Sequence, residues 1–414
     1  MIKSYLLLAW KVLLRRKFFT FISLFGISFT LVVLMLVTSL LDHVVAGFPP
    51  ETQYERTVGI YYTAMRGEHA NRNGFAGYGL LDRCARNLPN VEKMAVASLP
   101  SGAFSYLNGQ RIKSFMKRTD GNFWRILDFH FVEGGPFTET DVKDHRMVAV
   151  INETTRQRFF GGQPALAKSI EVDGQRFTIV GVVPDVPILR IVPFADIWVP
   201  HTTAKSDSYT KELVGDFMGI LLLRDPSKLA LTRDEFWSRL RTVPMPDPLF
   251  ASVEATPETL FDTIGRMFIG NGTGIGTGYG DRLRLALLIA AALFMLLPAV
   301  NLINLNTSRI MERASEIGVR KAFGASSWTL VGQFIVENLV LTLVGAAIGF
   351  VLASWLLGLL NGSGLIEYAD LQLNYRIFFW GALLAVAFGL LSGVYPAWRM
   401  SRLHPVQALK GTSR

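Results

Sequence analysis

Charged residues are scarce in this sequence. Only 18% of the 414 residues are Asp, Glu, Lys or Arg, whereas 50% are hydrophobic. A soluble globular protein carries nearer a quarter charged residues. The deficit is concentrated in a few long apolar runs, which is typical of a protein that crosses a membrane.

Cysteine is also nearly absent. Cys84 is the only one, which excludes an intramolecular disulfide and a cysteine-based zinc site. The sequence has no GxxxxGK followed by Ser or Thr, no HExxH and no GxSxG, so it lacks a Walker A loop and two common hydrolase motifs. The histidines are scattered, and the pair His130 and Glu133 is more typical of a surface than of a metal site. We therefore expect no catalytic residues, and no cofactor or metal bound by this chain.

Four apolar runs are each long enough to cross about 30 Å of hydrocarbon as a helix. They cover residues 18–41, 285–308, 326–360 and 377–398, and Glu337 alone interrupts the third. The alternative, four buried helices of a soluble protein, is a poor explanation because a soluble core does not need runs of this length. The first run is too long for a signal peptide and no A-x-A cleavage pattern follows it, so we interpret it as a retained anchor.

The positions of Lys and Arg predict the orientation of these spans. The excess positive charge lies in 1–17, in 309–325 and in 399–414, whereas the charges in 42–284 sum to zero. Because cytoplasmic loops carry the excess of Lys and Arg, we predict both termini in the cytoplasm and 42–284 outside, with 361–376 as a short outer loop. The net charge of +9 is then a topology signal and not a nucleic-acid surface.

The outer segment, 42–284, shows strand and helix patterns in alternation. Residues 147–151 are typical of a buried strand, and a helix is predicted over 153–160 with Asn152 as its N-cap and Gly161 after its end. These patterns predict an α+β domain with a core of its own, and its length leaves room for two subdomains.

Turn signals predict further elements of this domain. Asp173-Gly174 lies between two β-branched runs and predicts a hairpin over 169–183. Short helices are predicted over 81–88 and 233–240. The glycine-rich run 270–280 lacks the Lys-Ser/Thr of a phosphate-binding loop, so we interpret it as a hinge before the second span.

The segment between the second and third spans is the most informative. It reads RIMERASEIGVRKAFG, with Glu312, Glu316 and Arg320 on one face of a predicted helix and Gly324 at its end. A short charged helix between two spans can be a passive interfacial loop or a lever that another protein moves.

These residues resemble the MacB–FtsX-type ABC permease family. The family's E-x-x-x-E-I-G-x-x-R/K-A-x-G-A loop is matched between Glu312 and Ala325, and its YPAxxAxxxxPVxAL ending is similar to residues 395–409. Residues 148–183 resemble the MacB-type extracytoplasmic domain. The resemblance implies a membrane all-α domain of four helices, with a large α+β extracytoplasmic domain inserted between the first and second, and with 1–17 as an amphipathic cytoplasmic helix.

The same resemblance implies a function and partners. It implies a permease subunit that couples ATP hydrolysis to movement of the outer domain (mechanotransmission), for export or extraction of a macrolide-like compound, a peptide or a lipoprotein. MacB itself carries an ATPase domain that this sequence does not show, so we expect ATP-Mg in a separate ABC ATPase subunit. We expect the chain to lie in a bacterial inner membrane, in contact with lipid, as a homodimer or a heterodimer with a related permease. A periplasmic adaptor and an outer-membrane channel are further expected partners. The alternatives are an FtsX-like signalling or scaffold protein and an anchored enzyme, and the missing catalytic motifs disfavour the enzyme.

Two sets of site residues follow. By resemblance, the residues that contact the ATPase are expected to be Glu312, Arg313, Glu316, Ile317, Gly318, Arg320, Lys321, Gly324, Arg399, Arg402 and Pro405. Small residues at helical spacing predict close packing between spans, or reflect the general enrichment of such residues in membrane helices; they are Gly345, Gly349, Gly381, Ala385, Gly389 and Gly393. The second span also carries a polar stripe of Asn301, Asn304 and Ser308. We expect this stripe to hydrogen-bond a neighbouring helix or a second permease chain, and a substrate site is the less favoured alternative.

Overall fold

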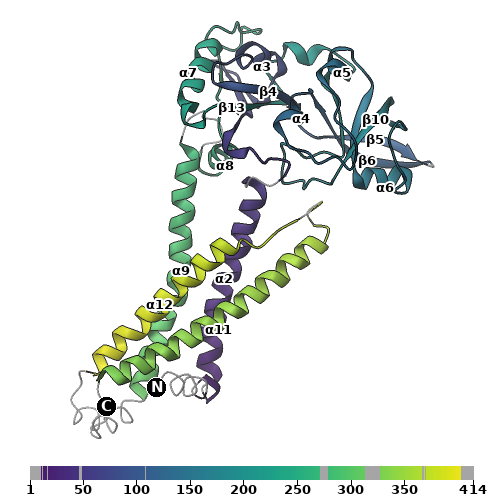
Figure 1. The fold of residues 1–414 in the computed structure, drawn as a ribbon. Helices are drawn as coiled ribbons and strands as arrows, with labels where there is room; N and C mark the ends of the chain where they lie inside the picture. The colour runs from purple at the N-terminus through teal and green to yellow at the C-terminus, as the bar shows by residue number, and fades with distance from the viewer. Residues whose placement is uncertain are drawn as a thin grey trace. The chain divides into compact units, whose positions relative to one another are not determined.

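The computed structural model describes residues 11, 13–15, 17–45, 49–107, 109–270, 278–312, 327–365, 368 and 370–401 (Figure 1). The chain divides into two compact units. Residues 1–42, 286–363 and 371–414 form one, which we call the helical unit, and residues 43–285 and 364–370 form the other, which we call the strand-rich unit.

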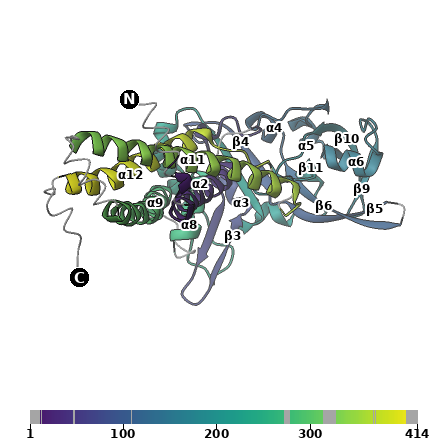
Figure 2. The same cartoon turned by 90° about the horizontal axis from the view of Figure 1, so that it is seen from below.

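Among its described residues the helical unit has four helices, namely α2 (Lys17–Val45), α9 (Tyr279–Glu312), α11 (Ser327–Gly362) and α12 (Tyr375–Ser401). Helices α11 and α12 run side by side in both views (Figure 1, Figure 2). Among the described residues, the stretches 17–43 and 335–362 are each apolar and long enough to span a bilayer, and α12 contributes a shorter apolar stretch.

The described strands of the strand-rich unit form one mixed sheet. Its hydrogen-bonded order is β14-β2-β3-β13-β4-β6-β11-β8-β10-β7, with β1, β12, β5 and β9 paired beside this path. The strands are β1 Thr57–Ile60, β2 Tyr62–Arg66, β3 Asn71–Ala76, β4 Val91–Ser98, β5 Ser101–Leu107, β6 Gln110–Thr119, β7 Glu133–Gly134, β8 Val148–Asn152, β9 Ser169–Val172, β10 Gln175–Val183, β11 Ile197–Pro200, β12 Val214–Gly215, β13 Phe217–Leu223 and β14 Ser252–Ala255.

Short helices pack on this sheet. They are α3 Tyr78–Cys84, α4 Phe123–Ile126, α5 Glu139–Lys143, α6 Glu153–Phe160, α7 Leu229–Leu240 and α8 Leu260–Ile269, with 3-10 turns η1 Tyr54–Arg56, η2 His201–Thr203, η3 Ser208–Lys211 and η4 Pro226–Lys228. Most strand pairs are antiparallel, but β6 with β11 and β8 with β10 are parallel. Three clusters of buried apolar side chains lie on the sheet, and Phe236, Trp198 and Phe177 are fully buried members of them.

The predicted strand, cap and helix around Asn152 are confirmed. The β8 strand is followed by α6, and the Asn152 side-chain oxygen accepts a hydrogen bond from the Thr155 backbone N–H at 2.9 Å. Gly161 ends α6 in the left-handed conformation at φ 60°. The hairpin is confirmed as β9 and β10, because Asp173 (φ 49°) and Gly174 (φ 71°) both take the positive φ of a type I′ turn.

Two predicted helices have different bounds. The helix expected over 81–88 is α3, Tyr78–Cys84, and the prediction of its end is wrong because the chain leaves the helix before Asn87, whose φ of 54° is left-handed. The helix expected to begin at residue 233 begins at Leu229, since Asp225 accepts from the Ser227 N–H and organises the turn before it. Of the glycine-rich run, residues 271–277 lie outside the described part of the chain.

Candidate functional site

The chain enters or leaves the strand-rich unit at three places. At each place, buried polar contacts within this unit hold the connecting segment. We call them the α9 joint (residues 257–266 and 279–284), the α2 joint (49–51 with 117 and 190–192) and the loop joint (Tyr368 with Asp196). Each joint holds a segment that enters or leaves the sheet.

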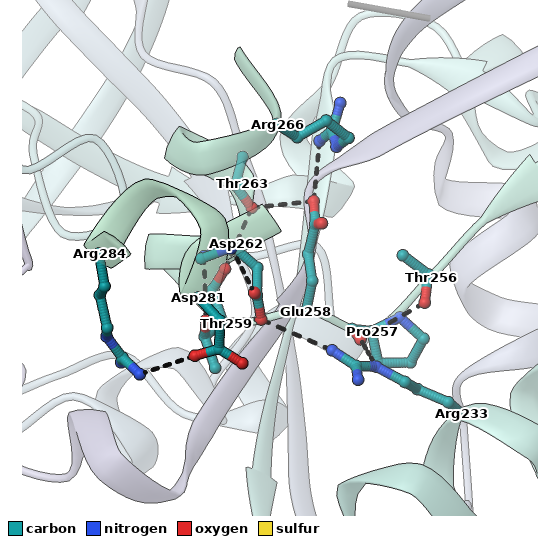
Figure 3. A network of polar contacts seen from close by, with 11 residues as sticks. Arg233, Thr256, Pro257, Glu258, Thr259, Asp262, Thr263, Arg266, Asp281 and Arg284 are labelled. Atoms are coloured by element: carbon teal, nitrogen blue, oxygen red, sulfur yellow. Dashed lines mark hydrogen bonds and ion pairs between the residues drawn. The ribbon is translucent and has the colours of Figure 1, made fainter. Parts of the chain in front are cut away.

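At the centre of the α9 joint is a buried ion pair (Figure 3). The Arg266 guanidinium lies 2.8 Å from Glu258 Oε1, and the two side chains are only 3% and 2% exposed. The Thr263 hydroxyl donates to the same carboxylate oxygen at 2.9 Å, and the Arg266 guanidinium lies 4.3 Å from the centre of the Tyr62 ring. Because water does not reach these side chains, each buried charge is stabilised by its partner and not by solvent.

The α9 joint also fixes the first turn of α9. Thr259 caps α8 by accepting from the Asp262 N–H, and Asp262 in turn accepts from the Gly280 N–H at 3.0 Å. Gly265 has to lack a side chain, because a Cβ there would lie 2.4 Å from the carbonyl oxygen of Tyr279. Helix α8 and the start of α9 are therefore in backbone contact. Arg233 completes the network by donating to the Pro257 carbonyl and pairing with Asp262 (Figure 3).

The α2 joint lies just after the end of α2. Arg190 donates to Glu51 through Nε and one terminal nitrogen, and to the Pro49 carbonyl through the other. Next to them Lys117 is fully buried, with Nζ donating to the carbonyls of Ile191 and Val192. Burial lowers the pKa of Lys117 to about 7, and the nearby Glu51 charge opposes this shift. Burial also raises the pKa of Glu51 against the effect of Arg190.

The loop joint attaches the segment between α11 and α12 to the sheet. The Tyr368 hydroxyl donates to Asp196 Oδ1 at 2.9 Å, and Asp196, 3% exposed, also accepts from the Asn152 side-chain amide and the Phe115 N–H. Tyr368 has a left-handed backbone (φ 57°), and its ring lies 6.5 Å from that of Phe194. Burial and the adjacent Asp196 carboxylate raise the pKa of Tyr368.

Most residues predicted to contact an ATPase lie outside the described part of the chain. Glu312 is the last residue of α9 and Arg399 lies near the end of α12, each placed by its backbone only. The others fall on undescribed residues; these are Arg313, Glu316, Ile317, Gly318, Arg320, Lys321, Gly324, Arg402 and Pro405. The side chains of Asn301, Asn304 and Ser308 are likewise outside the description, whereas Glu337 is buried in α11.

Four of the six small residues predicted at helix contacts have side chains of another helix next to them, namely Gly345, Gly349, Gly381 and Gly389. A Cβ on Gly345 would lie 2.9 Å from Ile27 Cγ2 of α2. A Cβ on Gly349 would lie 3.2 Å from the Cβ of Leu31, also on α2. Gly381 faces α2 and Gly389 faces Thr342 of α11. Ala385 is partly buried in α12, and nothing beyond its backbone position is described for Gly393.

Sequence reasoning missed all three joints. Segment 361–376 was expected to be a short outer loop, and no contact between it and the sheet was predicted; its residues 364–370 belong to the strand-rich unit. Glu258 and Arg266 match no motif, and the one available signal was the amphipathic pattern of 260–269, in which a lone arginine follows mostly apolar residues.

Two family models match the chain. One, described as a MacB-like periplasmic core domain, matches residues 20–237, and the other, described as FtsX-like permease C-terminal, matches residues 288–405. Together the two models place the chain among the permeases of the ABC transporter class. The first model alone covers more than half of the sequence, and the chain belongs to the MacB/FtsX-type ABC permease family.

Relatives are similar over most of the chain. The macrolide export ATP-binding/permease protein MacB of Wolinella succinogenes is 27% identical over 322 residues, which cover 76% of this chain but only 46% of that protein. The uncharacterised ABC transporter permease YknZ of Bacillus subtilis is 22% identical over 363 residues, covering 86% of this chain and 85% of that one. The crystal structure of the extracellular domain of a YknZ transporter from Gram-positive bacteria is 15% identical, covering 48% of this chain and 99% of that domain, with a TM-score of 0.37.

Proposed function

We propose that this chain is the permease subunit of an ABC transporter that works by mechanotransmission. Its four helices cross the inner membrane of a bacterium, both termini are cytoplasmic, and the strand-rich unit is outside. A separate ATPase subunit binds ATP-Mg and moves segments 309–325 and 399–414. The joints relay this movement to the strand-rich unit, where a substrate is handled.

The observation that carries this proposal is the α9 joint. A buried ion pair and a backbone contact between α8 and α9 hold the first turn of α9 firmly within the strand-rich unit. Displacement of α9 along its axis would therefore move the sheet instead of being absorbed by a loose connection. The α2 and loop joints add two further attachments of the same kind.

The names of the relatives support the class of activity. One is an export protein with ATP-binding and permease functions, and another is an ABC transporter permease. We therefore propose export or extraction of a macrolide-like compound, a peptide or a lipoprotein. Two permease chains, identical or related, assemble with two ATPase subunits, and a periplasmic adaptor and outer-membrane channel extend the path.

The test measures coupling in the reconstituted complex of permease and ATPase. Spin labels on the strand-rich unit report its movement when ATP is added, while phosphate release reports hydrolysis. Reversing both charges in Glu316→Lys and Arg320→Glu is expected to abolish the movement while hydrolysis continues. The matched control reverses Glu171 and Arg176, an exposed pair 3.9 Å apart on the sheet, and leaves coupling unchanged. Normal movement in the Glu316/Arg320 variant would contradict the proposal.

A second candidate function is regulation of an extracytoplasmic partner without transport. This candidate rests only on the resemblance to FtsX-type proteins, whose permease model matches residues 288–405. The two functions separate in one assay, since an exported compound stimulates ATP hydrolysis by a transporter, whereas a regulator is stimulated by its partner protein alone.

A further inference from the structure

Within the helical unit, an open apolar groove lies between α11 and α12. Its volume is about 620 Å³, within the range of about 300–1,000 Å³ that is typical of ligand sites. Every residue that lines it is Ala, Val, Leu or Phe. The short side chains of Ala346, Ala347 and Ala382 leave it hollow between larger neighbours such as Phe379 and Leu383. We call this hollow the α11–α12 groove.

The α11–α12 groove occupies only part of the length of the two helices. On α12 it is lined from Phe378 to Val386, which corresponds to about 12 Å along the helix axis. Just beyond that end the helices come into close contact, since a Cβ on Gly389 would lie 2.6 Å from Thr342 Oγ1. Half of the hydrocarbon core of a bilayer is about 15 Å thick, so the groove has the length of a lipid tail in one leaflet. A helix of a second chain that crosses the whole bilayer would need a groove about twice as long.

The first turns of α12 place a cation and two aromatic rings at the other end of this groove. Arg376 is exposed and lies one helical turn before Phe379, on the same face of α12. Within the described part of the chain its guanidinium has no ion-pair partner. Tyr375 and Trp380 are 70% and 56% exposed, and the Tyr375 ring lies 6.2 Å from the ring of Phe350 in the groove. Tyr and Trp are enriched at the level of the lipid headgroups, where cationic side chains meet phosphate.

We propose that the α11–α12 groove holds one acyl chain of a resident phospholipid, whose phosphate is bound by Arg376. An arginine and a phosphate form charge-assisted hydrogen bonds, and the apolar lining complements the tail. The proposal rests on the proposed function in one respect, namely that α11 and α12 lie in a bilayer; in that topology the lipid belongs to the outer leaflet. The bound tail supplies packing contacts that the two helices do not make with each other at this level.

The test measures lipid binding to the full chain, purified in detergent and freed of native lipid. Palmitoyl-oleoyl phosphatidylglycerol is titrated in, and native mass spectrometry counts the lipid molecules bound to each chain. Arg376→Gln removes the cation, and Ala347→Phe fills the groove from an exposed position. The matched controls are Arg282→Gln and Ala292→Phe, because both residues are exposed on α9 and neither lines the groove.

The expected result is one tightly bound phospholipid per chain, with a Kd at least about tenfold weaker in Arg376→Gln and in Ala347→Phe and unchanged in the two controls. Equal binding by all the chains would overturn the inference, as would weakening in only one of the two groove variants. Equal weakening in the controls indicates lipid held all around the helices and also overturns it.

A second copy of the chain in the groove would give a different result. The mass spectrum would then show a dimer that dissociates in Ala347→Phe while lipid binding persists, and this outcome too would overturn the inference. The assay contains neither ATP nor an ATPase subunit. Its failure would therefore leave the coupling test of the proposed function unaffected.

Discussion

Replacing Glu258 by glutamine tests the α9 joint directly. Glutamine keeps the size of the side chain and an oxygen that can accept from Thr263 and Arg266, but it removes the negative charge. The Arg266 guanidinium then remains buried, at 3% exposure, without a counter-charge. A buried charge without a counter-charge destabilises the fold, and this is why removing one partner of a buried ion pair lowers stability strongly.

The size of the effect follows from this burial. Breaking a buried ion pair by removing one partner costs about 3–5 kcal/mol. For a domain of 150–250 residues, each kcal/mol lowers the melting temperature by about 2–4 °C, so we expect a decrease of roughly 10 °C for Glu258→Gln. The assay is thermal unfolding of the full chain in nanodiscs, followed by tryptophan fluorescence.

The nearby pair of Arg66 and Glu254 supplies the matched control. Its separation is 3.4 Å and its side chains are 22% and 42% exposed, so Glu254→Gln should cost less than about 1 kcal/mol. Adding Arg266→Met to Glu258→Gln removes both charges and should restore much of the lost stability. Equal decreases for Glu258→Gln and Glu254→Gln, or no recovery in the double variant, would refute the role of charge at this joint.

Three further predictions concern other contacts. Tyr368→Phe removes a hydrogen bond to a buried carboxylate, and such a bond contributes about 1.5–3 kcal/mol to stability. Amide hydrogen exchange in segment 361–376 should therefore become about tenfold faster or more. An unchanged exchange rate would argue against the loop joint. The pKa of Lys117 is about 7 in the folded chain, whereas the ordinary value of 10.5 applies in the unfolded chain. Between these two pH values the unfolded chain therefore binds one proton more than the folded chain. Stability relative to Lys117→Met should therefore be constant below pH 7 and rise with pH from 7 to 10; a falling difference contradicts the assigned burial. Gly345→Ala should lower the melting temperature by overpacking, at about 1–3 kcal/mol, whereas Gly358→Ala, with open space around it, should not; equal effects would exclude close packing at Gly345.

Local signals in the sequence predicted local structure well. The strand, Asn152 cap and helix of 148–160 depend on residues within four positions of one another, so the sequence around them is sufficient. The apolar stretches of α2 and α11 were likewise evident from composition. The end of α3 was not, because the left-handed turn at Asn87 has no glycine to mark it.

The joints could not be predicted because they unite distant positions. Tyr368 bonds a residue 172 positions away, and Arg190 bonds Glu51 across 139 positions. No periodicity connects such residues, and each looks like an ordinary polar residue of a loop. Recognition of the family predicted a MacB-like periplasmic core domain in the chain but did not indicate which side chains hold it.

The backbone hydrogen bonds of Glu258 determine which strands of the sheet would bear a force applied to α9. Within the described part of the chain, the strand just before it, β14, lies at the edge of the sheet and pairs with β2 alone, over four residues, and a ladder of that length separates easily. Glu258 also exchanges two backbone hydrogen bonds with Gly59 of β1, at 2.8 and 2.9 Å, and β1 pairs with β13 in the interior of the sheet. Under the proposed mechanism, tension transmitted through α8 would therefore bypass the weak edge and be shared by the central strands, which would separate only if several ladders sheared together.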